Sequence, residues 1–336
     1  MSVSFEKMSP DQRDAFFAEG TRAYRQKKAQ AKASLQHGAD FIPAYQKGLV
    51  SLTGEELLKR EFPVREMLLA PLLPAKGLAM LFAERGIGKT WIGLNIAHAV
   101  AGGGVFLRWS APLPRRVCYI DGEMPASALK ERFAAIVAGS DFDAPEASFK
   151  LIAADLQADG LPDLADVSAQ RFYDAEIQEA DLIIVDNLST VCRSLRENEA
   201  DSWGPVQAWC LRQRAAGKSV LLIHHAGKGG EQRGTSRKED VLDTVIRLRR
   251  PIDYNASDGA RFEVHYTKTR GFWGDDAAPF EARLTDGKWT VGEIVSADGD
   301  EAIHTLRNEG MSVRNIAERL GMSKSAVDRK LNGGGK

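Results

Sequence analysis

Residues 77–95 constrain the fold of this chain more than any other stretch. They read as a short apolar strand, a glycine-containing loop and an amphipathic helix. The loop at 83–90, AERGIGKT, fits the phosphate-binding pattern G-x-x-x-x-G-K-S/T at every position except the first, where Ala83 replaces glycine. Glycines let backbone N–H groups turn toward a phosphate chain, and the start of the following helix adds its positive dipole end. The sequence therefore predicts a nucleotide site made by Glu84, Arg85, Gly86, Ile87, Gly88, Lys89, Thr90 and Trp91.

Two residues of this loop have predicted chemical roles. Lys89 is expected to reach the β- and γ-phosphates of a nucleoside triphosphate, and the Thr90 hydroxyl to help hold Mg²⁺. Ala83 indicates that the first loop residue adopts a backbone conformation that an alanine can reach. The alternative is a glycine turn that carries a chance lysine. A strand before the loop and a helix after it disfavour that alternative.

Strands alternate with helices from the loop to residue 225, which predicts an α/β fold. The predicted strands are 78–82, 116–123, 149–153, 182–186 and 219–225, and predicted helices at 127–137, 169–179 and 201–215 lie between them. Strands that are apolar on both faces indicate a mostly parallel sheet with helices on both sides. After a charged, glycine-rich stretch at 226–240, an edge-type strand at 241–249 and antiparallel strands at 261–269 and 280–291 extend the sheet at one edge.

Length and composition limit the number of domains and the class of protein. The 336 residues suggest about two domains. We predict a helical N-terminal extension at 1–60, an ATPase core at 61–295 and a helix-turn-helix at 300–332. A short helix is predicted at 53–61, with Thr53 as its cap. The apolar content of 43%, the charged content of 27% and the absence of a long apolar window favour a soluble protein and exclude a membrane span. Three widely spaced cysteines and no secretory signal favour the cytoplasm.

Two basic regions outside the core are candidates for nucleic-acid contact, although the net charge is only −1. The predicted helix near residues 22–32 carries five basic residues and is a solvated face, a nucleic-acid arm or an arm that docks on a neighbouring subunit. The three predicted helices of 301–332 share an apolar set across a glycine turn, as a helix-turn-helix does. Its DNA contacts would be Lys324, Ser325 and Arg329. A three-helix cap or an oligomerisation module is the alternative.

Polar residues follow four of the predicted core strands, where ligands sit in doubly wound sheets. Besides the loop, these ends carry Asp121 and Glu123, then Asp186, then His224 and His225. Asp186 is expected to hold Mg²⁺ and its water together with Thr90. Glu123 is the predicted general base because its strand is expected to neighbour the strand of the loop, and Asp121 is the alternative base. His225 is either a sensor of the γ-phosphate or a histidine satisfied near a strand end.

Five motifs in order resemble the RecA-like P-loop ATPases of the RepA group, which are hexameric replicative helicases of plasmids with relatives in phages and other mobile elements. The motifs are residues 83–90, 121–125 (DGEMP), 182–189 (LIIVDNLS), 222–228 (LIHHAGK) and 233–236 (RGTS), and the resemblance spans roughly residues 60–290. It implies ATP and Mg²⁺ as ligands, Glu123 as catalytic base, Lys89 and Thr90 on the phosphates and the metal, Asp186 on the metal water, and His225 as sensor.

The resemblance also implies active sites between the subunits of a ring, to which a neighbouring subunit supplies positive charge. Lys268 and Arg270 match a lysine–arginine spacing used in related ring helicases, and we predict Arg270 as the arginine finger. A basic hairpin end and a finger at Arg233 are the alternatives. The loop after His225 is predicted to face single-stranded DNA in the ring channel, with Lys228, Arg233, Arg237 and Lys238 as contacts.

The sequence thus leads to three hypotheses. The first is an ATP-hydrolysing, DNA-associated ring motor, a RepA-like hexameric helicase that serves replication of a mobile element. The second is a RecA-like ATPase switch or regulator that assembles on DNA without unwinding it. The third is a DNA-binding regulator whose nucleotide site controls only oligomerisation, and the full set of Lys89, Glu123, Asp186 and Arg270 argues against it.

Overall fold

The chain divides into two compact units, Met1–Glu66 and Met67–Lys336. The computed structural model describes residues 49–62, 64–195, 200–227, 236–251, 253–294, 299–308, 310–320 and 322–332. The described part of the first unit contains helix α2 (Gly54–Lys59). Thr53 caps this helix: its Oγ1 accepts the N–H of Glu56 at 3.2 Å, and the Thr53 N–H donates to Glu56 Oε2 at 2.7 Å. The predicted helix start at Thr53 is therefore confirmed.

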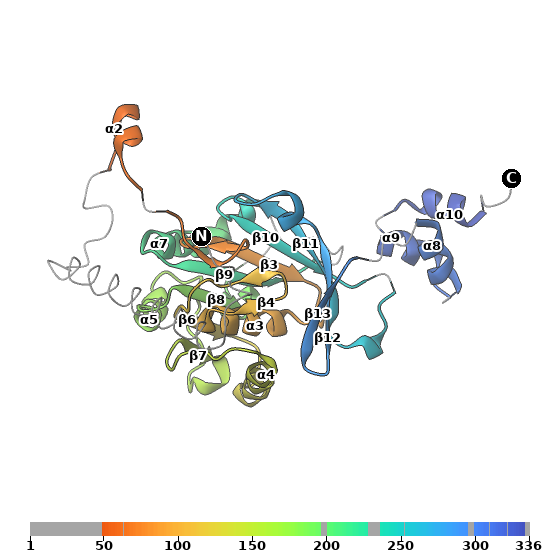
Figure 1. Cartoon of the computed structure of the whole chain (residues 1–336), viewed down its shortest axis with the longest axis horizontal. Helices are drawn as coiled ribbons and strands as arrows, with labels where there is room; N and C mark the ends of the chain where they lie inside the picture. The colour runs from red at the N-terminus through yellow and green to blue at the C-terminus, as the bar shows by residue number, and fades with distance from the viewer. Residues whose placement is uncertain are drawn as a thin grey trace, which may run out of the picture. The chain divides into compact units, whose positions relative to one another are not determined.

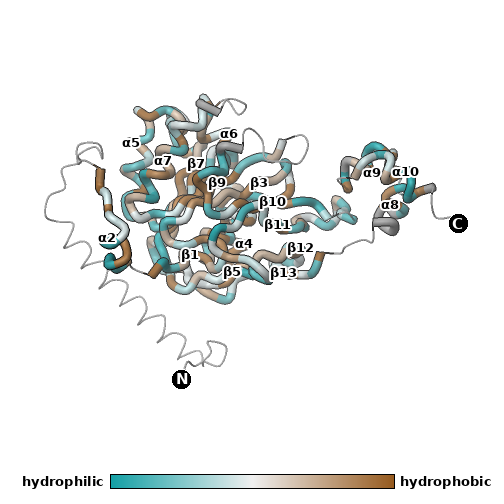
Figure 2. Tube along the Cα trace, turned by 90° about the horizontal axis from the view of Figure 1, so that it is seen from above, coloured by the Kyte–Doolittle hydropathy of each residue, from teal (hydrophilic) through white to brown (hydrophobic). Residues whose placement is uncertain are grey.

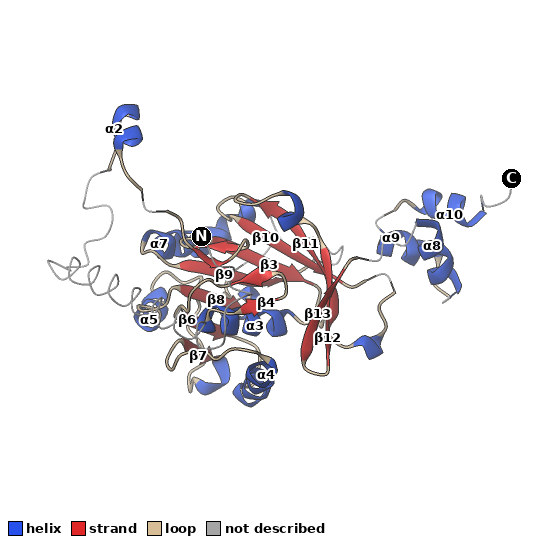
Figure 3. Cartoon of the chain, viewed as in Figure 1, coloured by secondary structure: helices blue, strands red, loops and turns tan. Residues whose placement is uncertain are grey.

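A mostly parallel sheet forms the centre of the second unit (Figures 1 and 3). Within the described residues, nine strands pair in the order β13-β12-β11-β10-β3-β9-β8-β6-β7. The strands from β10 to β7 run parallel, and β11, β12 and β13 are antiparallel. Their bounds are β3 (Leu78–Ala83), β6 (Val117–Asp121), β7 (Phe149–Ala153), β8 (Leu182–Asp186), β9 (Ser219–His225), β10 (Thr244–Arg249), β11 (Arg261–Thr269), β12 (Phe280–Thr285) and β13 (Lys288–Gly292). The α/β class and the antiparallel extension are confirmed.

Helices cover both faces of this sheet because its parallel strands are apolar on both faces. One face carries α3 (Lys89–Gly102), α4 (Ala126–Gly139) and two short hairpins, β1 (Met67–Leu69) with β2 (Leu73–Pro74) and β4 (Val105–Phe106) with β5 (Trp109–Ser110). The other face carries α5 (Gln170–Glu176), α6 (Leu188–Val191) and α7 (Gly204–Ala215). Short 3₁₀ turns lie at η3 (Ala154–Leu156), η4 (Ala200–Trp203), η5 (Ser236–Glu239), η6 (Ala256–Asp258) and η7 (Gly274–Ala277).

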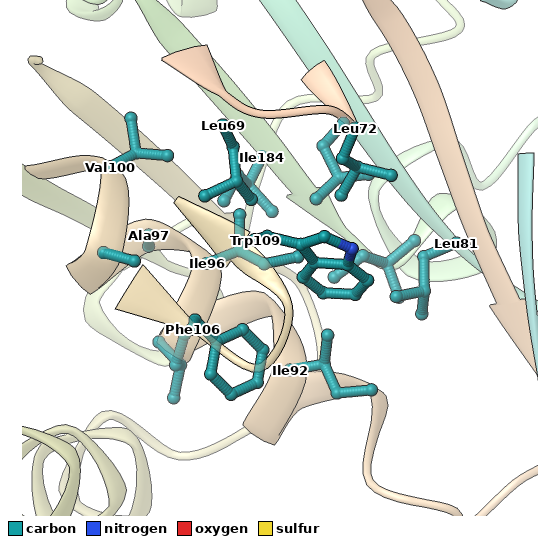
Figure 4. Packing of buried hydrophobic residues seen from close by; sticks show 14 of the residues in the cluster. Leu69, Leu72, Leu81, Ile92, Ile96, Ala97, Val100, Phe106, Trp109 and Ile184 are labelled. Carbon is teal, nitrogen blue, oxygen red and sulfur yellow. The ribbon is translucent and has the colours of Figure 1, made fainter. Parts of the chain in front are cut away.

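Successive side chains of the central strands point to opposite faces of the sheet and pack into two separate hydrophobic cores. Leu81 of β3 packs on the α3 side, whereas Met80 and Phe82 pack on the opposite side. Figure 4 shows the α3 side, where Trp109 of the β4–β5 hairpin lies among aliphatic side chains of α3, β3 and the β1–β2 hairpin. The indole N–H of Trp109 donates to the Tyr266 hydroxyl at 2.8 Å, so the buried ring keeps a polar partner.

Two expectations about single elements are wrong. Helix α3 is not amphipathic: Gly93, Asn95 and His98 are buried along with its apolar residues, because the hairpins and α4 enclose it. Strand β10 is not an edge strand, since it pairs parallel with β3 and antiparallel with β11. The half-buried Arg247 and Arg249 give β10 the alternation that is typical of an edge. Figure 2 shows β3 and β9, which form the middle of the sheet, as mainly hydrophobic.

The C-terminal part consists of three short helices with a small apolar core. They are α8 (Gly299–Asn308), α9 (Val313–Leu320) and α10 (Lys324–Asn332). Ile303 and Leu306 of α8 pack with Ile316 of α9 and Val327 of α10. Ser323 caps α10, because its Oγ accepts the N–H of Ala326 at 3.2 Å. The three predicted helices are present, and their use as a DNA-reading unit stays a prediction.

Neither a membrane span nor a disulfide occurs in the described parts of the chain. None of their helices is long and apolar enough to cross a membrane. Cys118, Cys192 and Cys210 are free and buried. Burial raises the pKa of the Cys118 thiol to about 12, so this group stays protonated and packs as a small apolar side chain.

Candidate nucleotide site

The register of the parallel strands brings the predicted polar strand ends to one edge of the sheet. Ala83 at the end of β3 lies opposite His225 at the end of β9, and Asp186 at the end of β8 lies opposite Asp121 at the end of β6. The expectation that the Glu123 strand neighbours the strand of the loop is wrong, since β9 and β8 lie between β3 and β6. Glu123 and Asp186 are nevertheless close enough to Lys89 to interact with it electrostatically.

The loop after β3 has the backbone that the sequence predicts. Gly86 and Gly88 have φ values of 76° and 117°, a left-handed region that favours glycine, and Gly88 is the N-cap of α3. Ala83 is still part of β3 and, within the described chain, is not one of the non-glycine residues with positive φ. The departure from glycine at the first position therefore requires no special backbone conformation.

Lys89 lies folded into the loop. Its Nζ donates to the carbonyl oxygens of Glu84 at 2.8 Å and Ala83 at 3.2 Å. Burial lowers the pKa of Lys89, and the nearby carboxylates of Asp186 and Glu123 oppose that shift. A buried cation is thus held within the loop, where a phosphate group would contact it directly.

The remaining predicted loop residues differ in their exposure. Glu84 and Arg85 are exposed, and Ile87 is buried in the core of the α3 side. Trp91 is half-buried, and the Arg132 guanidinium of α4 lies 5.5 Å from its ring centroid. The loop therefore exposes charged residues at its tip and is anchored at Ile87.

Asp186 is a buried carboxylate at the base of the site. Its Oδ2 accepts the Tyr119 hydroxyl at 2.7 Å, and the Thr90 side chain also hydrogen-bonds to it. Burial raises the pKa of Asp186, whereas the bonds from Tyr119 and Thr90 and the charge of Lys89 lower it. Asp186 and Thr90, predicted to share a metal, thus lie in contact.

These two residues fit Mg²⁺ by their chemistry. In the part of the chain that the structure describes, no three His, Cys, Asp or Glu residues form a dedicated metal cage. Mg²⁺ is commonly held by one or two carboxylates together with waters and substrate phosphates. One carboxylate and one hydroxyl beside a phosphate loop match that pattern.

Glu123 extends from the turn after β6 toward the end of β8. Its Oε2 accepts the side-chain N–H of Asn187 at 2.5 Å, and Nε2 of His225 lies 3.8 Å from the same oxygen. Its side chain is 58% exposed, so a water has access to the carboxylate. The predicted base, in the turn after β6, and the predicted sensor, at the end of β9, thus lie within ion-pair distance of each other.

Asp121, the alternative base, is less suited to proton transfer. Only 1% of the residue is exposed, and its Oδ1 accepts the N–H groups of Glu123 at 2.9 Å and Met124 at 2.6 Å. The buried Oδ2 has no hydrogen-bond partner among the described residues. Burial raises the pKa of Asp121 to about 6. Asp121 instead fixes the backbone that carries Glu123.

Sequence reasoning missed a pair of residues beside the loop. Arg250, just after β10, donates from Nη2 to the Gly86 carbonyl at 3.5 Å, and its guanidinium lies 4.1 Å from the centroid of the Tyr254 ring. The segment that carries Tyr254 is tied down by Arg261, which is 8% exposed and bonds Asp253, Asp258 and Glu281. Arg250 directly follows strand β10. This position would have indicated a site residue if β10 had been recognised as the parallel neighbour of β3.

The predicted finger residues lie at the opposite edge of the sheet. Thr269, the last residue of β11, pairs with Thr244 at the start of β10, so Lys268 and Arg270 are at the amino ends of the parallel strands. Lys268 donates to the Glu239 carbonyl, and Arg270 donates to the Asp240 carbonyl at 2.7 Å. One chain thus does not bring them to its own nucleotide loop.

The predicted DNA contacts have different outcomes. Lys228 and Arg233 lie outside the described residues, as does the side chain of Arg237. Lys238 is 1% exposed and its Nζ lies 3.3 Å from Nε2 of His224, so the prediction that it contacts DNA is wrong for this structure, because a buried ammonium cannot reach a phosphate. The exposed predicted contacts of α10 are Lys324, Ser325 and Arg329.

Comparisons with known proteins give a solved structure and a family model. The solved structure of a KaiC-like protein from the hyperthermophilic archaeon Pyrococcus horikoshii OT3 is similar, with 15% sequence identity over 68% of this chain and 95% of that chain and a TM-score of 0.47. A family model described as AAA domain matches residues 47–231, the part that contains the loop, Glu123, Asp186 and His225. Because this match spans more than half of the sequence, the chain belongs to the AAA domain family of ATPases.

Proposed function

We propose that this protein is an ATP-driven motor of the RepA-like type, which forms a ring and unwinds DNA during replication of a mobile element. The observation that carries the proposal is the division of one hydrolytic set between two edges of the sheet. Lys89, Asp186 and Glu123 converge at the carboxyl edge, whereas Lys268 and Arg270 lie at the amino edge. A second copy of the chain, placed with its amino edge on the first copy's carboxyl edge, would complete the set.

The residues of one chain would do most of the chemistry. The loop N–H groups and Lys89 bind the phosphates, and Glu123 accepts a proton from the water that attacks the γ-phosphate. Thr90 and Asp186 would hold Mg²⁺, which would supply positive charge to the phosphate chain. His225, whose Nε2 lies 3.8 Å from Glu123 Oε2, would respond to the loss of the γ-phosphate.

Arg250 and Tyr254 support the choice of a nucleotide as substrate. An aromatic ring and a guanidinium stacked on each other beside the loop offer a flat surface of the kind on which bases stack. Arg261 holds this surface in place through carboxylates of the same segment and of β12. A nucleobase would then lie on the β10 side of the loop, and the phosphates would extend toward Lys89.

The shared site is tested by mixing two inactive variants. Lys89→Ala removes the phosphate cation, and Arg270→Ala removes the finger, so each variant alone should lack ATPase activity. In random mixed assemblies about a quarter of the interfaces join an intact loop to an intact finger, and these should recover hydrolysis. Lys150→Ala, which removes an exposed lysine paired with Glu176, is the matched control and should hydrolyse ATP as the unmodified protein does. Hydrolysis that Arg270→Ala leaves unchanged would exclude the shared site.

Unwinding is tested separately with a strand-displacement assay on a forked duplex. The motor hypothesis expects ATP-dependent displacement that both Lys89→Ala and Arg270→Ala abolish. DNA-stimulated hydrolysis without displacement would overturn the helicase assignment and favour the alternative, an ATPase switch that assembles on DNA without unwinding it. Measuring the native mass with and without nucleotide tests the hexamer.

A further inference from the structure

We propose that Asn187 is a positioning residue for Glu123, fixing the carboxylate where it can accept a proton from the attacking water. This inference rests on the proposed function, since it assumes that Glu123 is the general base. Asn187 follows Asp186 directly and is 1% exposed, so its amide group needs partners within the protein. Both ends of that amide group have them.

The amide oxygen of Asn187 caps helix α6. Oδ1 accepts the N–H groups of Ser189 at 3.0 Å and Thr190 at 3.3 Å. Because only the oxygen of an amide group can accept N–H groups, these two bonds determine which end of the Asn187 amide faces α6. The NH₂ end must therefore face away from α6, and it donates to Glu123 Oε2 at 2.5 Å.

A second contact ties the same helix to the turn that carries Glu123. Gly122 N donates to the Asp186 carbonyl at 2.8 Å. A Cβ atom at Gly122 would lie 2.5 Å from Thr190 Oγ1 and 2.9 Å from Val191 Cγ2, so α6 packs directly on the bare backbone of this turn. Contacts with β8 and α6 thus fix both the backbone of the turn and the side chain of Glu123.

Besides Asn187, the Glu123 carboxylate has His225 Nε2 at 3.8 Å, which is longer than a hydrogen bond, so the Asn187 bond is the closer restraint on the side chain. The carboxylate is mostly exposed, and a free glutamate side chain rotates about three bonds. Its backbone is fixed by Asp121, but that fixes only where the side chain begins. The Asn187 bond restricts the carboxylate to the side of the site where Asp186 and Lys89 lie, as a general base in line with the γ-phosphate requires.

Three substitutions at position 187 separate this role from helix capping. Asn187→Ser keeps an oxygen that can cap α6 but is too short to reach Glu123. Asn187→Asp keeps the cap, but the group that faces Glu123 becomes a carboxylate oxygen, which cannot donate a hydrogen bond. Asn187→Ala removes both functions. Thr53→Ala is the control for loss of a helix cap, because it removes the bond from the Glu56 N–H to Thr53 Oγ1 in helix α2 and changes no contact of Asn187 or Glu123.

The measurements are kcat and KM for ATP, with the binding of a fluorescent ATP analogue as a separate readout. We expect Asn187→Ser, Asn187→Asp and Asn187→Ala to lower kcat by about 10- to 100-fold, with KM and analogue binding within about twofold of the unmodified protein. Thr53→Ala should keep the unmodified kcat. A kcat loss in Asn187→Ala that Asn187→Ser restores would show that only the cap matters and would overturn the proposal.

A double-mutant cycle with Glu123→Gln decides whether Asn187 acts through the base. Single-turnover hydrolysis by Glu123→Gln should be slow, and adding Asn187→Ser should slow it no further, because the group that Asn187 positions is already gone. An equal loss in both backgrounds would mean that Asn187 acts independently and would refute the positioning role. If Glu123→Gln hydrolyses ATP at the unmodified rate, the assignment of the base fails instead, which is a distinguishable result.

Discussion

The variant Tyr119→Phe tests how the buried carboxylate of Asp186 is held in the nucleotide site. The residue is fully buried on β6, and its hydroxyl donates to Asp186 Oδ2 at 2.7 Å. Tyr119→Phe keeps the ring and its packing and deletes only that donor. Asp186 would keep Thr90 as a donor, but its buried oxygen Oδ2 would lose the Tyr119 donor.

The size of the effect follows from the burial of both groups. A hydrogen bond to a buried carboxylate contributes about 2 kcal/mol, so Tyr119→Phe should lower the free energy of unfolding by that amount. In a domain of this size the midpoint of thermal unfolding should fall by about 4–8 °C. ATP hydrolysis should fall as well, because burial already raises the pKa of Asp186 and the loss of a donor raises it further.

Tyr173→Phe is the matched control for this experiment. Tyr173 is also buried, but its hydroxyl donates to the neutral carbonyl of Pro162, away from the site. The control should lose about 1 kcal/mol of stability and no ATPase activity. If Tyr119→Phe melts and hydrolyses ATP like the unmodified protein, the hydroxyl does not hold Asp186 and the reasoning is refuted.

Gly93 tests the same contact from the opposite side. A Cβ atom there would lie 2.7 Å from the Tyr119 hydroxyl and 2.7 Å from Ile223 Cδ1. Gly93→Ala gains about 1 kcal/mol of helix propensity and loses about 1–3 kcal/mol to crowding. Combined with Tyr119→Phe, which removes one crowded atom, it should destabilise the protein by about 1 kcal/mol less than the sum of the two single changes. Strict additivity in thermal unfolding would contradict this packing argument.

Two further predictions concern residues outside the site. Burial lowers the pKa of His98 below its usual 6.5, so the unfolded chain binds the proton more tightly than the folded chain and stability is lost as the pH falls below about 6.5. Thermal unfolding at pH 8 and pH 5 measures this acid sensitivity, which His98→Gln should reduce. His304→Gln, at an exposed position, should leave it unchanged. Arg261→Gln should cost about 2–3 kcal/mol in denaturant unfolding and weaken nucleotide binding, because the partly buried carboxylates of Asp258 and Glu281 lose a buried cation. Arg283→Gln, which removes an exposed guanidinium from Asp258, should cost less than about 1 kcal/mol, and equal costs would contradict the assigned role of Arg261.

Strand positions could be predicted from the sequence because local composition determines them. The predicted strands at 149–153, 182–186 and 219–225 coincide with β7, β8 and β9. Each is an apolar run bounded by polar residues, which is a signal carried within the segment itself. The phosphate loop could be predicted for the same reason, since its residues are contiguous.

Strand order could not be predicted in this way. A strand that is apolar on both faces fits equally well beside any other such strand, so nothing in the sequence placed β9 and β8 between β3 and β6. Contacts that depend on this order were missed with it. Asn187 donates to Glu123, 64 residues earlier in the chain, only because β6 and β8 are neighbours.

The order of the strands has a consequence for the proposed assembly. If Arg270 acts on a neighbour's nucleotide, the contact joins the amino edge of one sheet to the carboxyl edge of the next. Such a head-to-tail contact is heterologous, so it propagates until it closes into a ring or continues as a filament. A ring predicts a single assembled mass at all protein concentrations above the threshold, whereas a filament predicts a mass that grows with concentration. Arg270→Ala should then lower hydrolysis in either form, and only the mass measurement separates a ring motor from a filament that switches on DNA.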